Sequence, residues 1–301
     1  TDVTNGARRM KKKEFDKCQA NGVTDITEVL IGYDGIVIAN SKKSTQFKLS
    51  RADIYNALAK MVPGPGGKLI DNPYKTWKDV NPDLPANKIE VLGPPPTSGT
   101  RDAFAELALG GGAKANADIK TLKGLKADKA DEIKAMLDKL GLPADTYDKM
   151  KAKKKKDPKG KDFFKMIAYT IREDGAYIEA GENDNLIVNK LEKNTNALGI
   201  FGYSFLEQNA DKLQGSVIEG QAATPEAVAA GDYKVSRPLY FYIKKSHIGQ
   251  VPGIAEYAAE FVADSTAGED GYLIDKGLIP LDAAKLKEVQ ADVKAMKNLS
   301  M

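Results

Sequence analysis

Gly93-Pro94-Pro95-Pro96-Thr97-Ser98-Gly99-Thr100-Arg101-Asp102-Ala103-Phe104 is the stretch from which the fold can be predicted. The apolar run 89–92 before it has the length of a strand. After it, apolar residues at helical spacing predict a helix that the glycines 110–112 end. A strand, a stiff loop and a helix in this order are typical of an α/β protein.

The same loop has the composition of an anion site. The start of a helix exposes unpaired N–H groups and a partial positive charge, so anions bind there. Gly99 allows close backbone approach, Ser98 and Thr100 add hydroxyl donors, and Arg101 adds a planar fork suited to a tetrahedral oxyanion. An alternative stays open, in which Ser98 or Thr100 only caps the helix and Arg101 pairs with an acidic residue of that helix.

Strands and helices are predicted to alternate along the rest of the chain. Two strands are expected at Glu28–Ile31 and Ile36–Ala39, and Ser50–Asp53 spells a capping box. Later patterns predict strands at 200–205 and 239–243 and helices at 186–191, 254–263 and 286–296. We therefore expect α/β lobes with mixed, mainly parallel sheets.

Residues 114–161 differ in composition, being rich in Lys, Ala and Asp, and they predict a helical surface insertion. The basic run Lys153–Lys156 is compatible with an anionic partner. A solvated helix end beside Asp157-Pro158 is the favoured interpretation of this run.

Composition excludes several classes of protein. A net charge of +3 over 301 residues does not indicate a nucleic-acid binder, and no run reaches the 18 or more apolar residues of a membrane span. The single cysteine, Cys18, and single histidine, His247, spell no metal cluster and no Cys-His pair. We expect no enzyme, no metal and no cofactor.

The loop 93–104 resembles the anion loop of the phosphate-binding component of the bacterial phosphate ABC importer. Five further segments resemble the same family, in the same order, namely Asp2–Met10, Asn72–Val80, Gly175–Phe205, Ser236–Ile243 and Gly271–Leu281. The resemblance implies a two-lobed type II periplasmic-binding-protein clamp with a ligand cleft between the lobes. Lobe one would comprise 1–38 and 236–301, and lobe two 39–235.

The resemblance also implies the function and the site. The chain would bind inorganic phosphate with high affinity in the periplasm, or as a secreted protein, and deliver it to the membrane permease of an ABC importer. The implied contacts in lobe two are Ser98, the N–H of Gly99, Thr100 and Arg101. Lobe one would contribute through Ala7 and Arg8, at the position where the family places a small acceptor followed by an arginine.

A carboxylate is expected to accept the proton of HPO₄²⁻, because sulfate has no proton to donate and would be repelled. Glu179, Glu182 and Asp184 are the candidates, just before the helix expected at 186–191. Asn183 or Asn185 is a further possible donor to the anion, and a plain N-cap at Asn183 or Asp184 is the alternative.

A segment that precedes the match to Asp2 in the resembled family suggests that lobe one needs residues from outside this sequence. We expect either an upstream segment or a strand donated by another chain. Cys18 fits a partner cysteine elsewhere or a buried free thiol. The alternative function is an extracellular structural or assembly-forming protein that reuses the same lobes.

Overall fold

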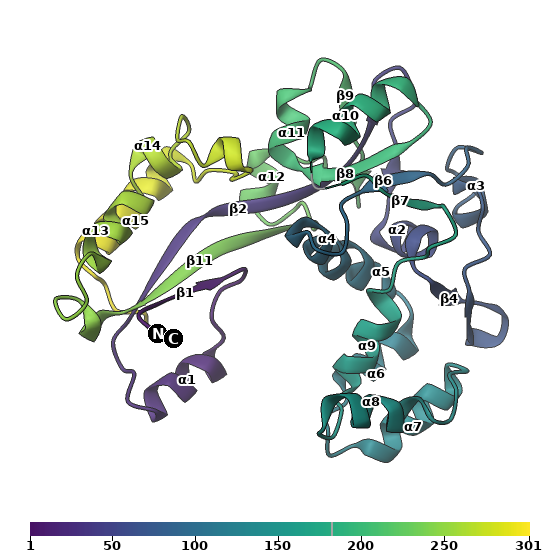
Figure 1. Cartoon of the computed structure of the whole chain (residues 1–301), viewed down its shortest axis with the longest axis horizontal. Coiled ribbons are helices and arrows are strands. Elements are labelled where there is room, and N and C mark those ends of the chain that lie inside the picture. Colours follow the sequence, from purple (N-terminus) through teal and green to yellow (C-terminus); the bar gives the residue numbers. More distant parts are fainter. Residues whose placement is uncertain (182) are drawn as a thin grey trace. The chain divides into compact units, whose positions relative to one another are not determined.

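The computed structural model describes residues 1–181 and 183–301, and of Asp184 only the backbone. The chain divides into two compact units, shown in one ribbon in Figure 1. Unit 1 comprises 1–35, 202–208 and 223–301, and unit 2 comprises 36–201 and 209–222. The lobe boundaries predicted at residues 38 and 235 remain a prediction.

Unit 1 contains an antiparallel sheet with the order β1-β11-β2. Its elements are β1 (Val3–Gly6), α1 (Lys12–Ala20), the first part of β2 (Ile26–Ser41), α11 (Tyr203–Gln208), α12 (Pro225–Ala229), β11 (Ser236–Lys244), η3 (Lys245–His247), α13 (Ile254–Phe261), α14 (Asp264–Ala267), η4 (Ile274–Lys276) and α15 (Ala283–Lys294). Helices α13 and α15 cover one face of this sheet (Figure 1), where Val29 and Phe241 pack against Leu286 and Val289 in the core.

Strand β2 runs without a break through Gly32-Tyr33-Asp34-Gly35, where two separate strands were predicted. The pairing of β2 with β11 shifts by one residue at this point, and a β-bulge in β2 opposite Leu239 and Tyr240 accommodates the shift. Gly32 is required there, because a Cβ on it would lie 2.6 Å from the carbonyl oxygen of Ile279. The two glycines between the predicted strands are therefore positions where another segment approaches a continuous strand.

Unit 2 is built on β6 with β7 and β8 as its parallel neighbours. Its elements are the rest of β2, β3 (Lys48–Leu49), α2 (Arg51–Leu58), β4 (Met61–Pro63), η1 (Pro65–Gly67), β5 (Leu69–Asp71), α3 (Trp77–Val80), β6 (Val91–Gly93), α4 (Gly99–Phe104), the π-helical η2 (Ala105–Leu109), α5 (Gly110–Ala113), α6 (Ala117–Gly124), α7 (Ala130–Lys139), α8 (Thr146–Lys154), α9 (Gly160–Ala168), β7 (Tyr177–Glu179), α10 (Asp184–Lys193), β8 (Leu198–Gly202), β9 (Leu213–Gly215) and β10 (Val217–Ile218). The pairing is parallel for β6 with β7 and β8, and antiparallel for β9 with β2, so the sheets are mixed.

The helix after the anion loop continues through Gly110–Gly112, where we expected it to end. These glycines serve helix packing, since a Cβ on Gly112 would lie 1.8 Å from the carbonyl oxygen of Arg51 in α2. The prediction of a strand at 200–205 is also wrong in its second half. Strand β8 ends at Gly202, and Tyr203–Gln208 is the helix α11.

The capping box at the start of α2 is confirmed. Ser50 Oγ accepts from the N–H of Asp53 at 3.0 Å, and the Asp53 carboxylate accepts from the N–H of Ser50 at 2.8 Å. Trp77 packs as a core residue, fully buried with its ring centroid 5.4 Å from that of Phe47.

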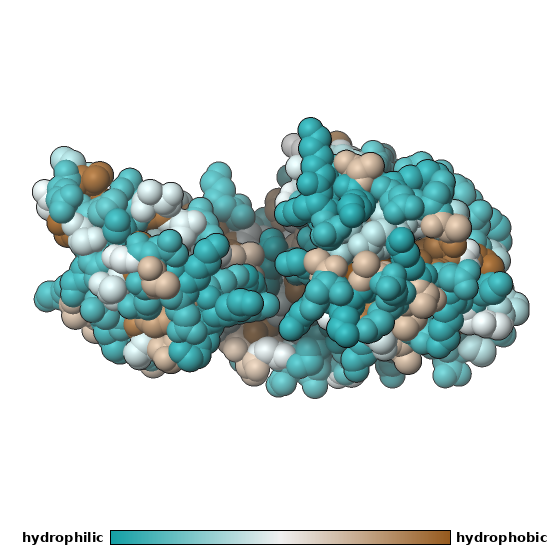
Figure 2. All heavy atoms as spheres, turned by 90° about the horizontal axis from the view of Figure 1, so that it is seen from below, coloured by the Kyte–Doolittle hydropathy of each residue, from teal (hydrophilic) through white to brown (hydrophobic). Residues whose placement is uncertain are grey.

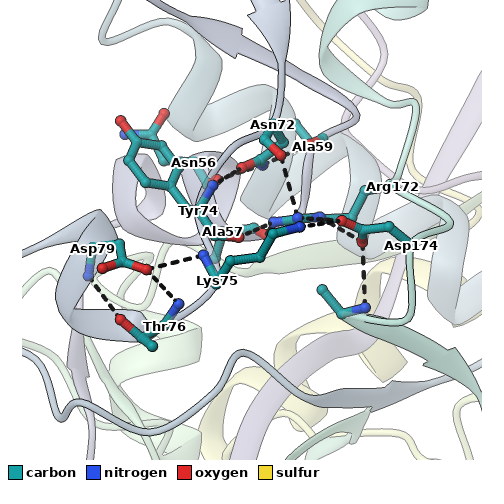
Figure 3. Close-up of polar contacts among 11 residues, drawn as sticks. Asn56, Ala57, Ala59, Asn72, Tyr74, Lys75, Thr76, Asp79, Arg172 and Asp174 are labelled. Carbon is teal, nitrogen blue, oxygen red and sulfur yellow. Dashed lines mark hydrogen bonds and ion pairs between the residues drawn. The ribbon is translucent and has the colours of Figure 1, made fainter.

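A buried arginine ties together three segments of unit 2 (Figure 3). Arg172 donates to the carbonyl oxygens of Ala57 at 3.2 Å, Tyr74 at 2.8 Å and Asn72 at 3.3 Å. Its guanidinium also pairs with Asp174, and this hydrogen bond lowers the pKa of the Asp174 carboxyl to about 2. The arginine thus fixes the end of α2, the loop 72–74 and the segment that leads into β7.

The face of the molecule in Figure 2 is mostly hydrophilic, with small apolar patches between the polar side chains. Among the described residues, no helix combines the length and the apolar composition that a membrane span requires.

Candidate functional site

Two loops of unit 2 meet at the carboxyl edge of its parallel strands. Strands β6 and β7 are in register with Gly93 opposite Glu179, and the N–H of Ala180 donates to the carbonyl oxygen of Gly93 at 2.9 Å. Beyond this edge, the chain after β6 enters α4 and the chain after β7 enters α10. Open α/β sheets bind ligands outside the carboxyl ends of their strands, so this edge is the candidate site.

Helix α4 begins directly after the loop that follows β6. Ser98 is the N-cap, and its hydroxyl accepts from the N–H of Thr100 at 3.2 Å. Among the described residues, the N–H of Gly99 donates to no oxygen, as expected at a first helical position. A Cβ on Gly99 would meet no atom within 4 Å, so neither packing nor backbone conformation requires glycine there. Gly99 itself is exposed.

Arg101 is held beside the loop by three contacts. Its Nη1 donates to Glu179 Oε1 at 3.0 Å and to the carbonyl oxygen of Pro94 at 3.3 Å. The guanidinium carbon lies 4.7 Å from the ring centroid of Tyr177, whose hydroxyl donates to the same Pro94 oxygen at 2.7 Å. Gly93 makes room for this ring, because a Cβ there would lie 2.3 Å from the Tyr177 hydroxyl. The arginine is therefore fixed in place, with 17% of its side chain exposed.

Glu179 is the acidic partner of Arg101, whereas the sequence suggested a residue of the same helix for that role. It comes from the neighbouring strand β7, and 52% of its side chain is exposed. Ser98, Thr100, Arg101 and Glu179 therefore gather at one edge of unit 2, with a guanidinium and a carboxylate side by side.

Tyr177 was not predicted from the sequence as a residue of the site. The alternation Tyr177-Ile178-Glu179 carried the signal, because residues two apart in a strand point to the same face. Burial raises the pKa of the Tyr177 hydroxyl to about 12, so it stays protonated and keeps donating to Pro94.

The two site residues predicted in lobe one belong to unit 1. Ala7 and Arg8 follow β1 in unit 1, and both are exposed. The guanidinium of Arg8 makes two hydrogen bonds to the Glu14 carboxylate, at 2.6 and 2.8 Å. These bonds lower the pKa of Glu14 to about 2.

Asn183 is the N-cap of α10, and its side-chain oxygen accepts from the N–H of Asn185 at 3.0 Å. Within the described residues, no hydrogen bond from its side-chain NH₂ group is seen. Glu182 and the side chain of Asp184, the other two candidates for the proton acceptor, lie outside the described residues.

No group of three or more His, Cys, Asp and Glu side chains suited to a metal ion occurs in the part of the chain that the structure describes. His247 Nδ1 lies 2.5 Å from Asp2 Oδ1, which gives it a structural partner in unit 1. Cys18 is a free, half-buried thiol in α1.

Two curated relatives match most of this chain. The phosphate-binding protein PstS of Staphylococcus saprophyticus is 24% identical over 296 residues, covering 97% of this chain and 68% of that protein. PstS of Staphylococcus epidermidis is 27% identical over 284 residues, covering 91% of this chain and 63% of that protein. This chain spans about two thirds of the length of these relatives. Their names describe binding proteins and no enzyme.

Two solved structures share the fold. A possible phosphate binding protein from Planctomyces limnophilus matches with a TM-score of 0.65 at 20% identity, over 99% of this chain and 82% of that chain. An ABC-type phosphate transport receptor from Vibrio cholerae matches with a TM-score of 0.51 at 14% identity, over 93% and 80%. The chain thus has the α/β fold of the type II periplasmic binding proteins, and the resemblance to the phosphate-binding family is confirmed. A family model described as a PBP superfamily domain matches residues 1–265, so the chain belongs to the PBP superfamily.

Proposed function

We propose that this chain binds inorganic phosphate at the start of α4 and is the phosphate-binding component of an ABC importer, acting in the periplasm or outside the cell. The observation that supports this most is the N–H of exposed Gly99, which has no acceptor among the described residues and lies two positions before the fixed Arg101. The names of the relatives point to the same ligand.

The donors at this edge suit a tetrahedral oxyanion. The N–H of Gly99 and the hydroxyls of Ser98 and Thr100 supply neutral hydrogen bonds, and Arg101 supplies a charged one. Because Tyr177 and Glu179 already hold the guanidinium, little side-chain freedom is lost when an anion arrives.

Glu179 is our candidate for the acceptor of the phosphate proton. A carboxylate next to an anion site repels sulfate, which has no proton to donate, and accepts a hydrogen bond from HPO₄²⁻. Glu179 pairs with Arg101 at 3.0 Å, so both charges lie within reach of one ligand. This pairing predicts selectivity for phosphate and for arsenate, which carries the same proton.

Isothermal titration calorimetry with phosphate and sulfate, on protein freed of bound ligand, tests this proposal. Arg101→Ala should weaken phosphate binding by about 1.5 to 3 kcal/mol, because a charged hydrogen bond is lost. Glu179→Gln should narrow the preference for phosphate over sulfate by about tenfold or more. The pair Arg51–Glu219, at 2.9 Å in the same unit, supplies the matched controls Arg51→Ala and Glu219→Gln.

Equal affinities for phosphate and sulfate in the parent protein contradict the phosphate assignment. Unchanged phosphate affinity in Arg101→Ala shows that the site lies elsewhere. Arg8→Ala and Asn183→Ala, in the same titration, test whether these two residues and the region of Ala7 also contribute to the site.

A permease and a donated strand are the proposed protein partners. β1 ends the sheet order of unit 1, and within the described residues no strand pairs with its outer edge. Such an edge accepts an extended segment by strand addition. Adding upstream residues to the chain should then raise its unfolding temperature, and an unchanged temperature contradicts the strand-addition proposal.

A further inference from the structure

An open groove runs between helices α8 and α9 of unit 2, away from the candidate phosphate site. It has a volume of about 830 Å³. Its walls are one face of each helix, because the lining residues recur at intervals of three and four. They are Thr146, Lys149, Met150, Lys153 and Lys154 from α8, and Asp162, Lys165, Met166 and Ile167 from α9, followed by Tyr169 and Thr170.

The floor of the groove is apolar. Leu142 and Ile167 are buried, while Met150 is half-buried and Met166 is 37% exposed. Met61 also lines the groove. Methionine side chains are flexible and polarisable, so a floor with three of them adapts to the shape of an incoming apolar side chain.

The rim of the groove is basic. Five lysines, namely Lys60, Lys149, Lys153, Lys154 and Lys165, line it together with the two aspartates Asp145 and Asp162. Both aspartates are already neutralised, Asp145 by Lys149 at 2.8 Å and Asp162 by Lys154. Among the described residues, Lys60, Lys153 and Lys165 form no ion pair, although Lys165 lies over the ring of Tyr169 at 5.7 Å. Three cations are left to face a partner.

We propose that this groove binds the apolar face of an acidic amphipathic helix from a partner protein. An apolar floor with methionines between two helices is the setting in which such helices dock. The unpaired lysines on the rim match acidic side chains that flank an apolar stripe.

The length of the groove sets the length of the ligand. The lining residues of α8 extend from Thr146 to Lys154, which corresponds to about 12 Å at 1.5 Å per residue. Two turns of a docked helix fit this span, so two or three apolar residues at positions i, i+4 and i+7 are expected to fill the floor. The α8 wall of the groove belongs to the stretch 114–161, and the α9 wall follows it directly from Asp162 on. None of the lining residues lies within the segments that resemble the phosphate-binding family.

The experiment uses the full chain and a fluorescein-labelled peptide of leucine and glutamate, with leucine at helical spacing, and follows fluorescence anisotropy. We expect saturable binding that weakens with salt, and no binding of a second peptide in which lysine replaces every glutamate. Met166→Glu and the double variant Lys153→Glu/Lys165→Glu should each raise the Kd by about tenfold or more, by placing acidic groups against the acidic ligand.

Two controls separate the groove from general effects of charge. Lys151→Glu makes the same change in the same helix at a lysine that pairs with Asp157 and does not line the groove. Val251→Glu places an acid at a 38% exposed apolar residue of unit 1. Both should leave the Kd within about twofold of the parent value. Circular dichroism of all variants verifies that they are folded.

Three results overturn the proposal. They are the absence of saturable peptide binding, equal weakening in the groove variants and the controls, and equal binding of the lysine peptide. Vesicles of phosphatidylglycerol and phosphatidylcholine are titrated in parallel. If the vesicles bind in a Met166-dependent manner and the peptide does not, the groove serves a membrane surface and the helix proposal is wrong.

Discussion

Replacing Arg172 by methionine should strongly destabilise unit 2. The side chain is only 3% exposed and donates to the carbonyl oxygens of Ala57, Asn72 and Tyr74. Methionine fills a similar volume but donates nothing, so three buried or partly buried acceptors lose their partner, at about 1 to 3 kcal/mol each. Asp174 is 40% exposed, and water can hydrate its carboxylate after the change, which limits the total.

We expect the free energy of unfolding to fall by about 4 kcal/mol, within the range measured when one partner of a buried ion pair is removed. With a urea dependence of about 2 kcal/mol per M, the unfolding midpoint moves down by about 2 M. The chain has one tryptophan, Trp77, which is fully buried in unit 2, so its fluorescence follows this unit in a urea titration.

Arg51→Met is the matched control in the same unit. Arg51 makes one half-exposed ion pair with Glu219, so its loss should cost about 1 kcal/mol or less. If the two variants shift the urea midpoint equally, the burial of Arg172 and its three carbonyl contacts add nothing to the free energy of unfolding beyond an exposed ion pair.

Two further predictions concern the same unit. The Asp174 carboxyl has a pKa of about 2 because Arg172 donates to it, below its ordinary value of 3.8, so its contribution to stability is complete above pH 3.8 and is lost as the pH falls through about 2. The difference in urea midpoint between the parent and Asp174→Asn should therefore shrink over this interval, and a constant difference contradicts the assignment. Gly112→Ala should destabilise the packing of α5 on α2, since its Cβ would meet the carbonyl oxygen of Arg51 at 1.8 Å. Gly124→Ala, where a Cβ meets nothing within 4 Å, should be neutral or slightly stabilising in thermal unfolding, and equal effects of the two changes refute the argument.

Local patterns in the sequence predicted the elements whose causes are local. The capping box at Ser50 and the apolar spacing of Leu286, Val289 and Val293 involve residues a few positions apart, and the structure has both helices. The strand-loop-helix unit around Ser98 is confirmed for the same reason.

Predictions failed where a distant segment decides the conformation. Gly110–Gly112 lie within a helix because Arg51 and Tyr169 approach them, and neither residue is near in sequence. Gly32 lies within a continuous strand because the carbonyl of Ile279 approaches it. The partner of Arg101 follows from the register of β6 and β7, which places Glu179 opposite Gly93, a residue 86 positions away in the sequence. The register between two strands cannot be predicted from the sequence of either strand alone.

The three consecutive prolines 94–96 before the anion loop have a consequence for the thermodynamics of binding. Proline fixes φ near −65°, so this segment samples few conformations even before folding. The carbonyl of Pro94 is also bonded from two sides, by Tyr177 and by Arg101. A ligand at Ser98 therefore meets a loop that is already ordered, and its capture should carry only a small conformational entropy penalty from this loop.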